Sequence, residues 1–229
     1  VTLECPASLK TLLEGSNVAD RLIADGESRP EFDAWTPLMS LPGLLGTDMD
    51  SIPADCPYLS AASADVPLTP DERALKVGIV WRGSLTNNRG RFRSCALSDL
   101  EPLTDVPGIQ VFSLQTELAP EDAARLELLG IVDLGSGFDD FSGSAAAVQS
   151  MDLIVSVDTA MAHLAGALGK SVWTMLSTMP DWRWFLDRAD SPWYPTMRLF
   201  RQRRVSDWAQ VVGEVSAALA ELKQPRLVT

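Results

Sequence analysis

The chain has 229 residues, 46% of them hydrophobic and 22% charged, which is enough for one large or two modest globular domains. Its 31 acidic and 19 basic residues give a net charge of −12. A chain this acidic lacks the basic surface that nucleic acids and anionic membranes attract, so neither is an expected partner.

Cysteine and histidine usage argues against further classes of site. The three cysteines lie far apart and there is one histidine, a pattern unlike a zinc site or a disulfide framework. We expect Cys5, Cys56 and Cys95 to be free thiols, with no metal and no cofactor. No apolar run is long enough to span a membrane and no signal peptide is visible, so the expected location is cytoplasmic.

The first part of the chain is predicted to be a small α/β unit. Val1 to Cys5 predicts a strand, Pro6 opens a helix that Gly15 ends, and Arg21 to Ala24 predicts a second strand. Another strand is expected from Asp33 to Thr36. Frequent prolines and glycines then predict irregular chain.

From Leu75 onward, apolar runs alternate with helical patterns, which predicts an α/β fold with a doubly wound, Rossmann-like parallel sheet. Most runs are continuously apolar, as strands covered on both faces are. Ser206 is the expected N-cap of the last helix. The six expected strands are Lys76–Trp81, Ile109–Leu114, Ile131–Leu134, Leu153–Val157, Ser171–Leu176 and Met197–Phe200.

These patterns divide the chain into four parts. A small, polar, proline-bearing stretch separates the irregular region from the regular one, as linkers do. We expect the remainder of a smaller N-terminal α/β domain over residues 1–60 and a linker over 61–74. A nucleotide-binding domain is expected over 75–204, with a C-terminal helix and tail over 205–229.

The strongest candidate site lies where a buried strand runs directly into a helix, at Asp158. Ligands bind at the carboxyl ends of strands in open parallel sheets, and unpaired N–H groups at a helix start favour phosphate. Thr159 and Ala160 supply such donors, and His163 shares a helix face with Thr159. Alternatively, Asp158 only caps the helix and His163 is an ordinary, partly buried histidine. Residues after two other strands would border the same ligand: Trp81, Gly83 and Gln115.

A second candidate is the loop over residues 82–94, the one basic patch of an acidic chain. Arginine binds phosphate bidentately and compensates developing negative charge. The alternative is an ordinary solvated surface loop. The loop contains four arginines, Arg82, Arg89, Arg91 and Arg93, and ends at Ser94.

A third candidate is an aromatic segment without clear periodicity, beginning at Asp181, Trp182 and Arg183. Amphipathic rings in a loop suit contact with a sugar or a nucleobase. They also suit packing between domains, which we favour for Trp184 and Trp193.

The chain resembles known glycosyltransferases at several of these places. The segment from Val157 to Lys170 resembles the Asp-Thr-Gly-x-x-His-x-x-Ala signature of heptosyltransferase-like glycosyltransferases, family nine. Longer stretches look like the glycosyltransferase region of bacterial tetratricopeptide-repeat proteins. They are Gly78–Gly83, Arg93–Ser94, Ser113–Gln115, Pro180–Trp184, Ser191–Gln202, Pro37–Pro42 and Ile52–Leu59.

The resemblance implies a GT-B architecture, in which two Rossmann-like domains face each other across a cleft. The donor nucleotide would bind in the C-terminal domain, with Thr159 and Ala160 holding its diphosphate. Asp158 and His163 would line the same pocket, and Gln115 would lie at a neighbouring strand end. The terminal helix would pack back towards the first domain, and helical repeats would lie outside this chain.

Two departures from that pattern stand out. Family members have glycine where this chain has Ala160, which makes a positive φ less available there. Related chains also begin with a strand and a glycine-rich turn, ending in an aspartate, ahead of the stretch that corresponds to Val1. That turn lies on the acceptor side, so we expect the catalytic base to be missing from this sequence.

The resulting expectation is a metal-independent, inverting glycosyltransferase that uses a nucleotide-diphosphate sugar. Its acceptor is left open among a glycan, a lipid-linked group and a protein. One alternative is a non-catalytic module that kept the fold to bind a nucleotide sugar or a protein, and another is a nucleotide-sugar epimerase. Hydride transfer, P-loop chemistry and α/β-hydrolase chemistry lose support, because their glycine-rich and serine motifs do not occur in the sequence.

Overall fold

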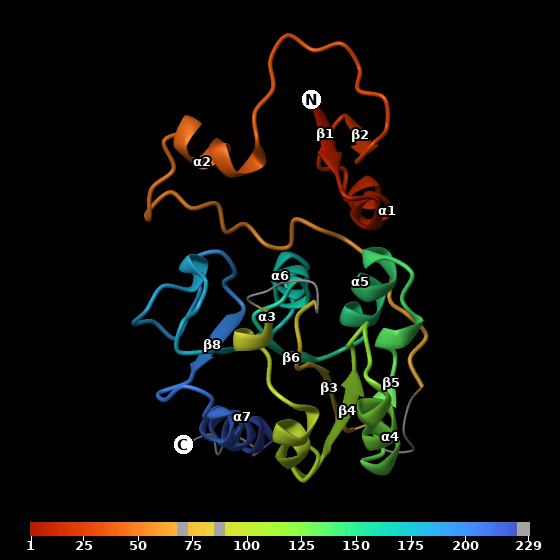
Figure 1. Cartoon of the computed structure of the whole chain (residues 1–229), viewed down its shortest axis with the longest axis vertical. Coiled ribbons are helices and arrows are strands. Elements are labelled where there is room, and N and C mark those ends of the chain that lie inside the picture. Colours follow the sequence, from red (N-terminus) through yellow and green to blue (C-terminus); the bar gives the residue numbers. More distant parts are fainter. Residues whose placement is uncertain (68–72, 85–89, 224–229) are drawn as a thin grey trace.

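The computed structural model describes residues 1–67, 73–84 and 90–223. A six-stranded sheet with helices on both faces forms the larger part of the molecule (Figure 1). The N-terminal residues form a separate, smaller part beyond the helices α5 (Phe141–Gln149) and α6 (Ala160–Ala167). The chain therefore has the predicted α/β fold.

Every neighbouring pair of strands in the large sheet is parallel, as predicted. The order is β5-β4-β3-β6-β7-β8, so β6 is central and all five of its residues are buried. The observed strands differ from the expected ones by no more than one residue at either end. They are β3 (Leu75–Val80), β4 (Ile109–Ser113), β5 (Val132–Asp133), β6 (Leu153–Val157), β7 (Val172–Leu176) and β8 (Met197–Arg201).

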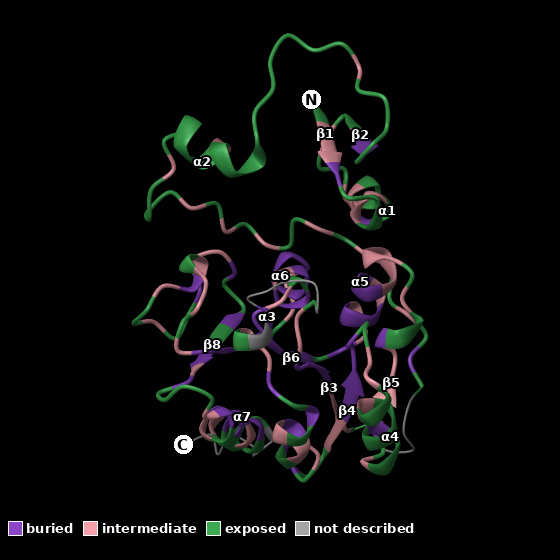
Figure 2. Ribbon diagram, in the orientation of Figure 1, coloured by how far each residue is buried: buried purple, intermediate pink, exposed green. Residues whose placement is uncertain are grey.

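Two apolar layers cover this sheet because alternate strand residues point to opposite faces. Helices α5 and α6 pack on the face nearer the N-terminal part, while α4 (Pro120–Leu128) and α7 (Trp208–Lys223) pack on the other with the 3-10 helix η2 (Leu97–Leu103). Figure 2 shows the buried sides of these helices turned towards the strands. Shorter helices connect the rest: η1 (Leu38–Ser40), α2 (Leu41–Leu44), α3 (Gly90–Arg93), η3 (Gly135–Gly137) and η4 (Trp182–Trp184).

The terminal helix α7 corrects two expectations. It packs on η2 and β8, not back towards the N-terminal part, because Val211, Val215 and Leu219 are buried in the core on that face of the sheet. Its N-cap is Asp207, whose carboxylate accepts a hydrogen bond from the backbone N–H of Gln210 at 3.2 Å. The predicted cap, Ser206, lies one residue earlier with a φ of 62°.

The N-terminal part contains two parallel strands, β1 (Thr2–Cys5) and β2 (Arg21–Ala24), and the helix α1 (Ala7–Ser16), which packs against α5. The helix continues through Gly15, and the left-handed residue that follows it is Asn17, an asparagine that tolerates this conformation. The strand expected from Asp33 to Thr36 does not form, since Trp35 is 75% exposed and no strand among the described residues pairs with this stretch.

The first half of the predicted linker packs along α5. Ala64 donates its backbone N–H to the carbonyl of Ala146 at 3.0 Å, the Ser150 hydroxyl donates back to the Ala64 carbonyl, and Val66 is buried. Residues 68–72 of that linker lie outside the described residues. Among the helices that are described, none has the length and apolar character needed to cross a bilayer.

Candidate functional site

The start of α6 lies at the carboxyl end of the central strand β6. Asp158 follows the strand and is 4% exposed, and Thr159 occupies the N-cap position without a side-chain cap bond to the helix. The Thr159 hydroxyl instead pairs with the Ser156 hydroxyl at 3.0 Å. The helix therefore begins without a side-chain cap, and its first N–H groups keep their capacity to bind an anion.

Ala160 is the first residue of α6 and has ordinary helical backbone. The positive-φ residues other than glycine in the described chain are Asn17, Phe185 and Ser206. Alanine in place of the glycine in the resembled signature therefore adds no backbone strain at this position.

An ion pair neutralises the carboxylate beside the helix start. The Arg93 Nη1 donates to Asp158 Oδ2 at 2.9 Å, with the arginine side chain 25% exposed. Without this partner, Asp158 would repel a phosphate. With it, the local charge is balanced, and the buried Nε of Arg93 has no hydrogen-bond partner among the described residues.

Hydrogen bonds from two side chains hold the loop after β3 in place. The Gln115 side chain accepts from the backbone N–H of Arg82 at 3.0 Å and donates to its carbonyl at 3.1 Å. The Ser94 hydroxyl accepts from Gly83 N–H at 3.2 Å. A Cβ on Gly83 would lie 3.9 Å from Thr159 Cγ2, so this loop runs beside the helix start.

The four arginines of the loop do not act together. Arg82 turns towards α4, where its guanidinium donates to the Glu117 carbonyl at 2.9 Å and lies 3.3 Å from Asp122. Arg89 lies outside the described residues, and the side chain of Arg91 is likewise outside them. Among the arginine side chains described in the loop, Arg93 is the one at the α6 start.

Two predicted site residues sit deeper than the site. Trp81 is 1% exposed and belongs to the core on the α7 face of the sheet. Gln115 is 4% exposed, and the two hydrogen bonds to Arg82 occupy its amide. Both residues therefore support the loop from the buried interior of the protein.

His163 is held between two rings from the aromatic segment. Its Nδ1 lies 3.0 Å from the Tyr194 hydroxyl, and its ring stacks on Trp184 with centroids 4.9 Å apart. Burial lowers the pKa of His163, and the nearby carboxylate of Asp158 only partly opposes that shift. The imidazole is therefore neutral at neutral pH.

The rest of the aromatic segment forms its own cluster. Arg183 pairs with Asp181 at 2.8 Å and lies over the Trp182 ring at 4.5 Å. Burial opposes ionisation of Asp181, but hydrogen bonds from the Arg183 backbone and guanidinium outweigh it and lower the pKa of that carboxyl. Trp182 is 56% exposed, whereas Trp184 is fully buried and Trp193 donates its indole N–H to the Arg183 carbonyl.

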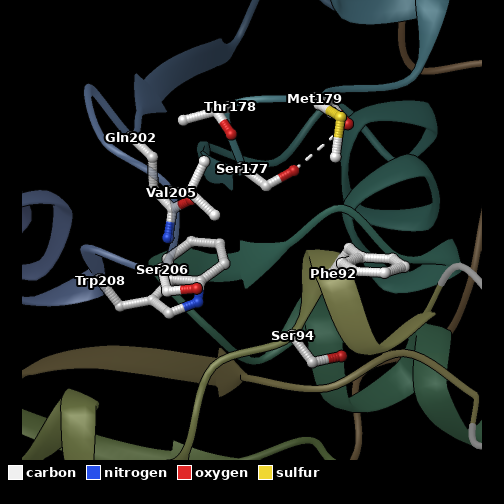
Figure 3. Close-up of a pocket in the computed structure, with 9 residues that line it drawn as sticks. All are labelled: Phe92, Ser94, Ser177, Thr178, Met179, Gln202, Val205, Ser206 and Trp208. Carbon is white, nitrogen blue, oxygen red and sulfur yellow. Dashed lines mark hydrogen bonds between the residues drawn. The ribbon is translucent and has the colours of Figure 1, made fainter.

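A hollow opens on the α7 side of the carboxyl edge (Figure 3). Its charge-free lining includes the Gln202 amide, whose nitrogen is buried and has no hydrogen-bond partner. The predicted residue Ser94 reaches this hollow. The lining residues are Phe92, Ser94, Ser177, Thr178, Met179, Gln202, Val205, Ser206 and Trp208.

Sequence reasoning did not anticipate the two contacts that organise the site. Arg93 is 65 residues from Asp158, and Tyr194 is 31 residues from His163. No periodicity links segments so far apart. The Ser156 hydroxyl, which pairs with Thr159, was hidden inside a strand that otherwise reads as apolar.

No family model matches the chain. Protein FlbA of Caulobacter vibrioides (strain ATCC 19089 / CIP 103742 / CB 15) is 33% identical to it over 155 residues. That match covers 64% of this chain and 25% of FlbA, so the chain spans about a quarter of the length of this curated relative.

Solved structures of glycosyltransferases show a distant likeness. E. coli heptosyltransferase WaaC with ADP-2-deoxy-2-fluoro heptose has a TM-score of 0.47 and 16% identity, over 67% of this chain and 45% of that one. The E. coli ADP-heptose lps heptosyltransferase II has a TM-score of 0.41 and 15% identity, over 67% of this chain and 49% of that one. The glycosyl transferase family 9 structure from Veillonella parvula DSM 2008 has a TM-score of 0.42 and 12% identity, over 70% and 41%. At these scores the likeness decides nothing about chemistry, which depends on the site itself.

Proposed function

We propose that this chain binds a nucleotide-diphosphate sugar at the start of α6 and serves as the donor-binding part of a glycosyltransferase. The observation that carries the proposal is the Arg93–Asp158 ion pair beside a helix start that has no side-chain cap. Helix N–H groups and an oriented arginine are two recurring means by which proteins bind phosphate without a metal.

The proposed reaction breaks the bond between the sugar's anomeric carbon and the diphosphate oxygen. The electron pair of that bond leaves with the diphosphate, and an acceptor hydroxyl forms the new bond while losing its proton to a base. Negative charge grows on the departing diphosphate, where the N–H groups of Ala160 and Met161 and the Arg93 guanidinium would stabilise it. Inversion at the anomeric carbon is part of the proposal on the strength of the family resemblance.

The aromatic segment is proposed to contact the sugar. Trp182 offers an exposed ring, and Asp181 and Arg183 offer hydrogen-bonding groups next to it. An amphipathic ring flanked by polar groups suits the apolar face and hydroxyl rim of a sugar. The acceptor is proposed to be a hydroxyl of a glycan, a lipid-linked group or a protein.

Calorimetric titration of the chain with ADP, UDP, GDP and CDP tests the binding step. Thr159→Val keeps the side-chain shape and removes a hydroxyl that would rotate from Ser156 to a bound phosphate, so it should weaken the best nucleotide roughly twofold to tenfold, as loss of one neutral hydrogen bond does. Thr178→Val makes the same exchange at a residue that lines the Gln202 hollow and should leave the affinity unchanged. If no nucleoside diphosphate binds the wild-type chain, the proposed function is wrong.

Turnover separates the two classes of function left open by the sequence. Release of nucleoside diphosphate from a nucleotide sugar in the presence of acceptor would support the transferase. Tight binding without turnover, by a preparation that includes the flanking parts of the protein, would favour the non-catalytic module.

A further inference from the structure

His163 is the single histidine of the chain, and its ring is fixed by aromatic neighbours from one distant segment. The Tyr194 hydroxyl lies 3.0 Å from His163 Nδ1, with the two rings at 63° and their centroids 5.8 Å apart. Trp184 stacks on the imidazole at an interplanar angle of 22°. The ring therefore has a defined plane and one defined hydrogen bond.

A glycine in α6 makes the approach of Tyr194 possible. Gly166 lies three residues after His163 and is buried, and a Cβ at this position would stand 2.5 Å from Cδ1 and Cγ of Tyr194. Glycine is unfavourable inside a helix, so its presence in the last turn of α6 needs a packing reason. The Tyr194 ring, lying directly on the helix backbone, is that reason.

The stacking ring is also anchored. The Arg201 guanidinium donates to the carbonyls of Trp184, Phe185 and Arg188, with the last two distances at 3.0 Å. These bonds tie the segment that contains Trp184 to the last residue of β8. Trp184 and Tyr194 therefore hold His163 against a rigid part of the sheet.

The direction of the Tyr194–His163 hydrogen bond follows from relative acidity. A phenol O–H, with an ordinary pKa of about 10, is a much stronger donor than the N–H of neutral imidazole, and imidazole nitrogen is a stronger acceptor than phenol oxygen. Burial raises the pKa of Tyr194, so the hydroxyl keeps its proton. Tyr58 is a second phenol near the Tyr194 hydroxyl, and burial raises its pKa too, so it also keeps its proton.

We propose that Tyr194 is a positioning residue: its hydroxyl donates to His163 Nδ1 and so keeps the imidazole proton on Nε2. Side chains of a helix lean towards its N-terminus, so His163 leans towards Thr159, one turn earlier. Nε2 then offers an N–H donor to the diphosphate proposed to bind at the α6 start. This inference rests on the proposed function for its consequence, but the tautomer itself is a property of the unliganded protein.

The alternative tautomer would work against binding. With the proton on Nδ1, Nε2 would present a lone pair to an anion. The charged groups around the ring form two pairs. Asp158 and Arg93 lie at the sheet edge, and Asp181 and Arg183 lie in the aromatic segment. Each side contributes one acid and one base that are paired with each other, so neither tautomer is imposed by net charge.

Nitrogen-15 NMR of the untagged chain tests the proposal, because a single histidine gives an unambiguous signal. At pH 8 the wild-type protein should show the Nε2–H tautomer in about tenfold excess, the bias expected from one hydrogen bond. Tyr194→Phe keeps the ring and removes the hydroxyl, so the excess should fall to about twofold or less. Tyr58→Phe removes the other hydroxyl and should leave the excess within about twofold of the wild-type value.

A second variant changes only the position of the Tyr194 ring. Gly166→Ala leaves the Tyr194 hydroxyl in place but displaces its ring, and should also lose the excess while the protein still unfolds cooperatively. A dominant Nδ1–H tautomer in the wild-type chain, or an unchanged excess in Tyr194→Phe, would overturn the proposal.

Calorimetry with the best-binding nucleoside diphosphate gives the functional readout. Tyr194→Phe should weaken binding several-fold, and Tyr58→Phe should not. If no nucleotide binds but the wild-type tautomer is Nε2–H, the proposed function fails while the Tyr194 assignment holds. If the nucleotide binds equally to wild type and Tyr194→Phe, the positioning role fails while the proposed function survives.

Discussion

The two parts of the molecule treat polar and apolar side chains in opposite ways. In the six-stranded part, Asp158 and Gln115 are almost fully buried, and each has defined partners. In the N-terminal part, most of the large apolar side chains between residues 30 and 50 lie in solvent. Those at least half exposed between residues 30 and 50 are Phe32, Trp35, Leu38, Met39, Leu44, Leu45 and Met49.

This difference locates the chemistry. A buried polar group is costly unless it is hydrogen-bonded, so partnered groups such as Asp158 have fixed positions that a reaction can use. Exposed apolar groups such as Trp35 impose no geometry on their neighbours. The comparison predicts that substitutions at the sheet edge change stability and binding strongly, and that substitutions of the exposed apolar residues between 30 and 50 change them little.

The largest effect is expected from Gly135→Ala. A Cβ there would stand 2.3 Å from the backbone carbonyl oxygen of Gln115, and backbone cannot move aside as a side chain can. We expect the free energy of unfolding to fall by about 3 kcal/mol in urea titrations. Gly137→Ala, two residues along and with open space around it, should change it by less than about 0.5 kcal/mol. Equal effects at both positions would remove the claim of tight packing at this edge.

Arg93→Ala should weaken nucleoside diphosphate binding by about 1.5–3 kcal/mol, the usual value for losing a charged hydrogen bond. Arg82→Ala removes a neighbouring arginine that points to Asp122 instead, and should leave affinity unchanged. Calorimetry on both variants shows which arginine contributes to nucleotide binding, after urea titration has shown that both variants are folded. Equal losses would mean that the loop acts only through its overall charge.

A pH effect of intermediate size is expected from His163. Its pKa is lowered in the folded protein because burial disfavours the charged ring, while the unfolded pKa is about 6.5. Above that pH the ring is neutral in both states. As pH falls below it, the unfolded chain takes up the proton first, so the free energy of unfolding falls by up to about 1.4 kcal/mol per pH unit.

His163→Gln lacks this titration and serves as the reference, since all carboxylates titrate in both proteins. The free energy of unfolding of the wild type minus that of the variant should decrease as the pH falls from 6.5 to 5.5. Parallel pH profiles would show that the histidine is solvated.

The smallest effect is expected from Trp35→Ser. This side chain is 75% exposed, so its removal should change the free energy of unfolding by less than about 0.5 kcal/mol, the range typical of surface positions. Nucleotide affinity should not change. A loss above about 1 kcal/mol would mean that the N-terminal part is packed as tightly as the sheet, and the comparison would no longer hold.

The sheet could be predicted from the sequence because a strand covered on both faces must be apolar along its whole length. Leu153–Val157 shows this most clearly. The helix start at Thr159 could be predicted because it follows directly from the end of that strand. The expected strand at Asp33–Thr36 had suitable residues but no partner, since pairing depends on a neighbouring strand that local sequence does not reveal.

The site was predicted only as far as backbone geometry determines it. The α6 start follows from a strand meeting a helix. The partner of Asp158 does not, because four arginines in one loop were equivalent by sequence and only loop conformation separates Arg93 from Arg82. The contact between Tyr194 and His163 depends likewise on how a loop after β7 folds back over α6.

Amide NMR tests the central claim, anion binding at the α6 start, most directly. On titration with the best-binding nucleoside diphosphate, the amide signals of Ala160 and Met161 should shift first and most, together with the Nε–H signal of Arg93. Amides around the Gln202 hollow and in the N-terminal part, such as Trp35, should stay in place. Saturable binding that shifts the Gln202 hollow and leaves Ala160 and Met161 unchanged would contradict the account.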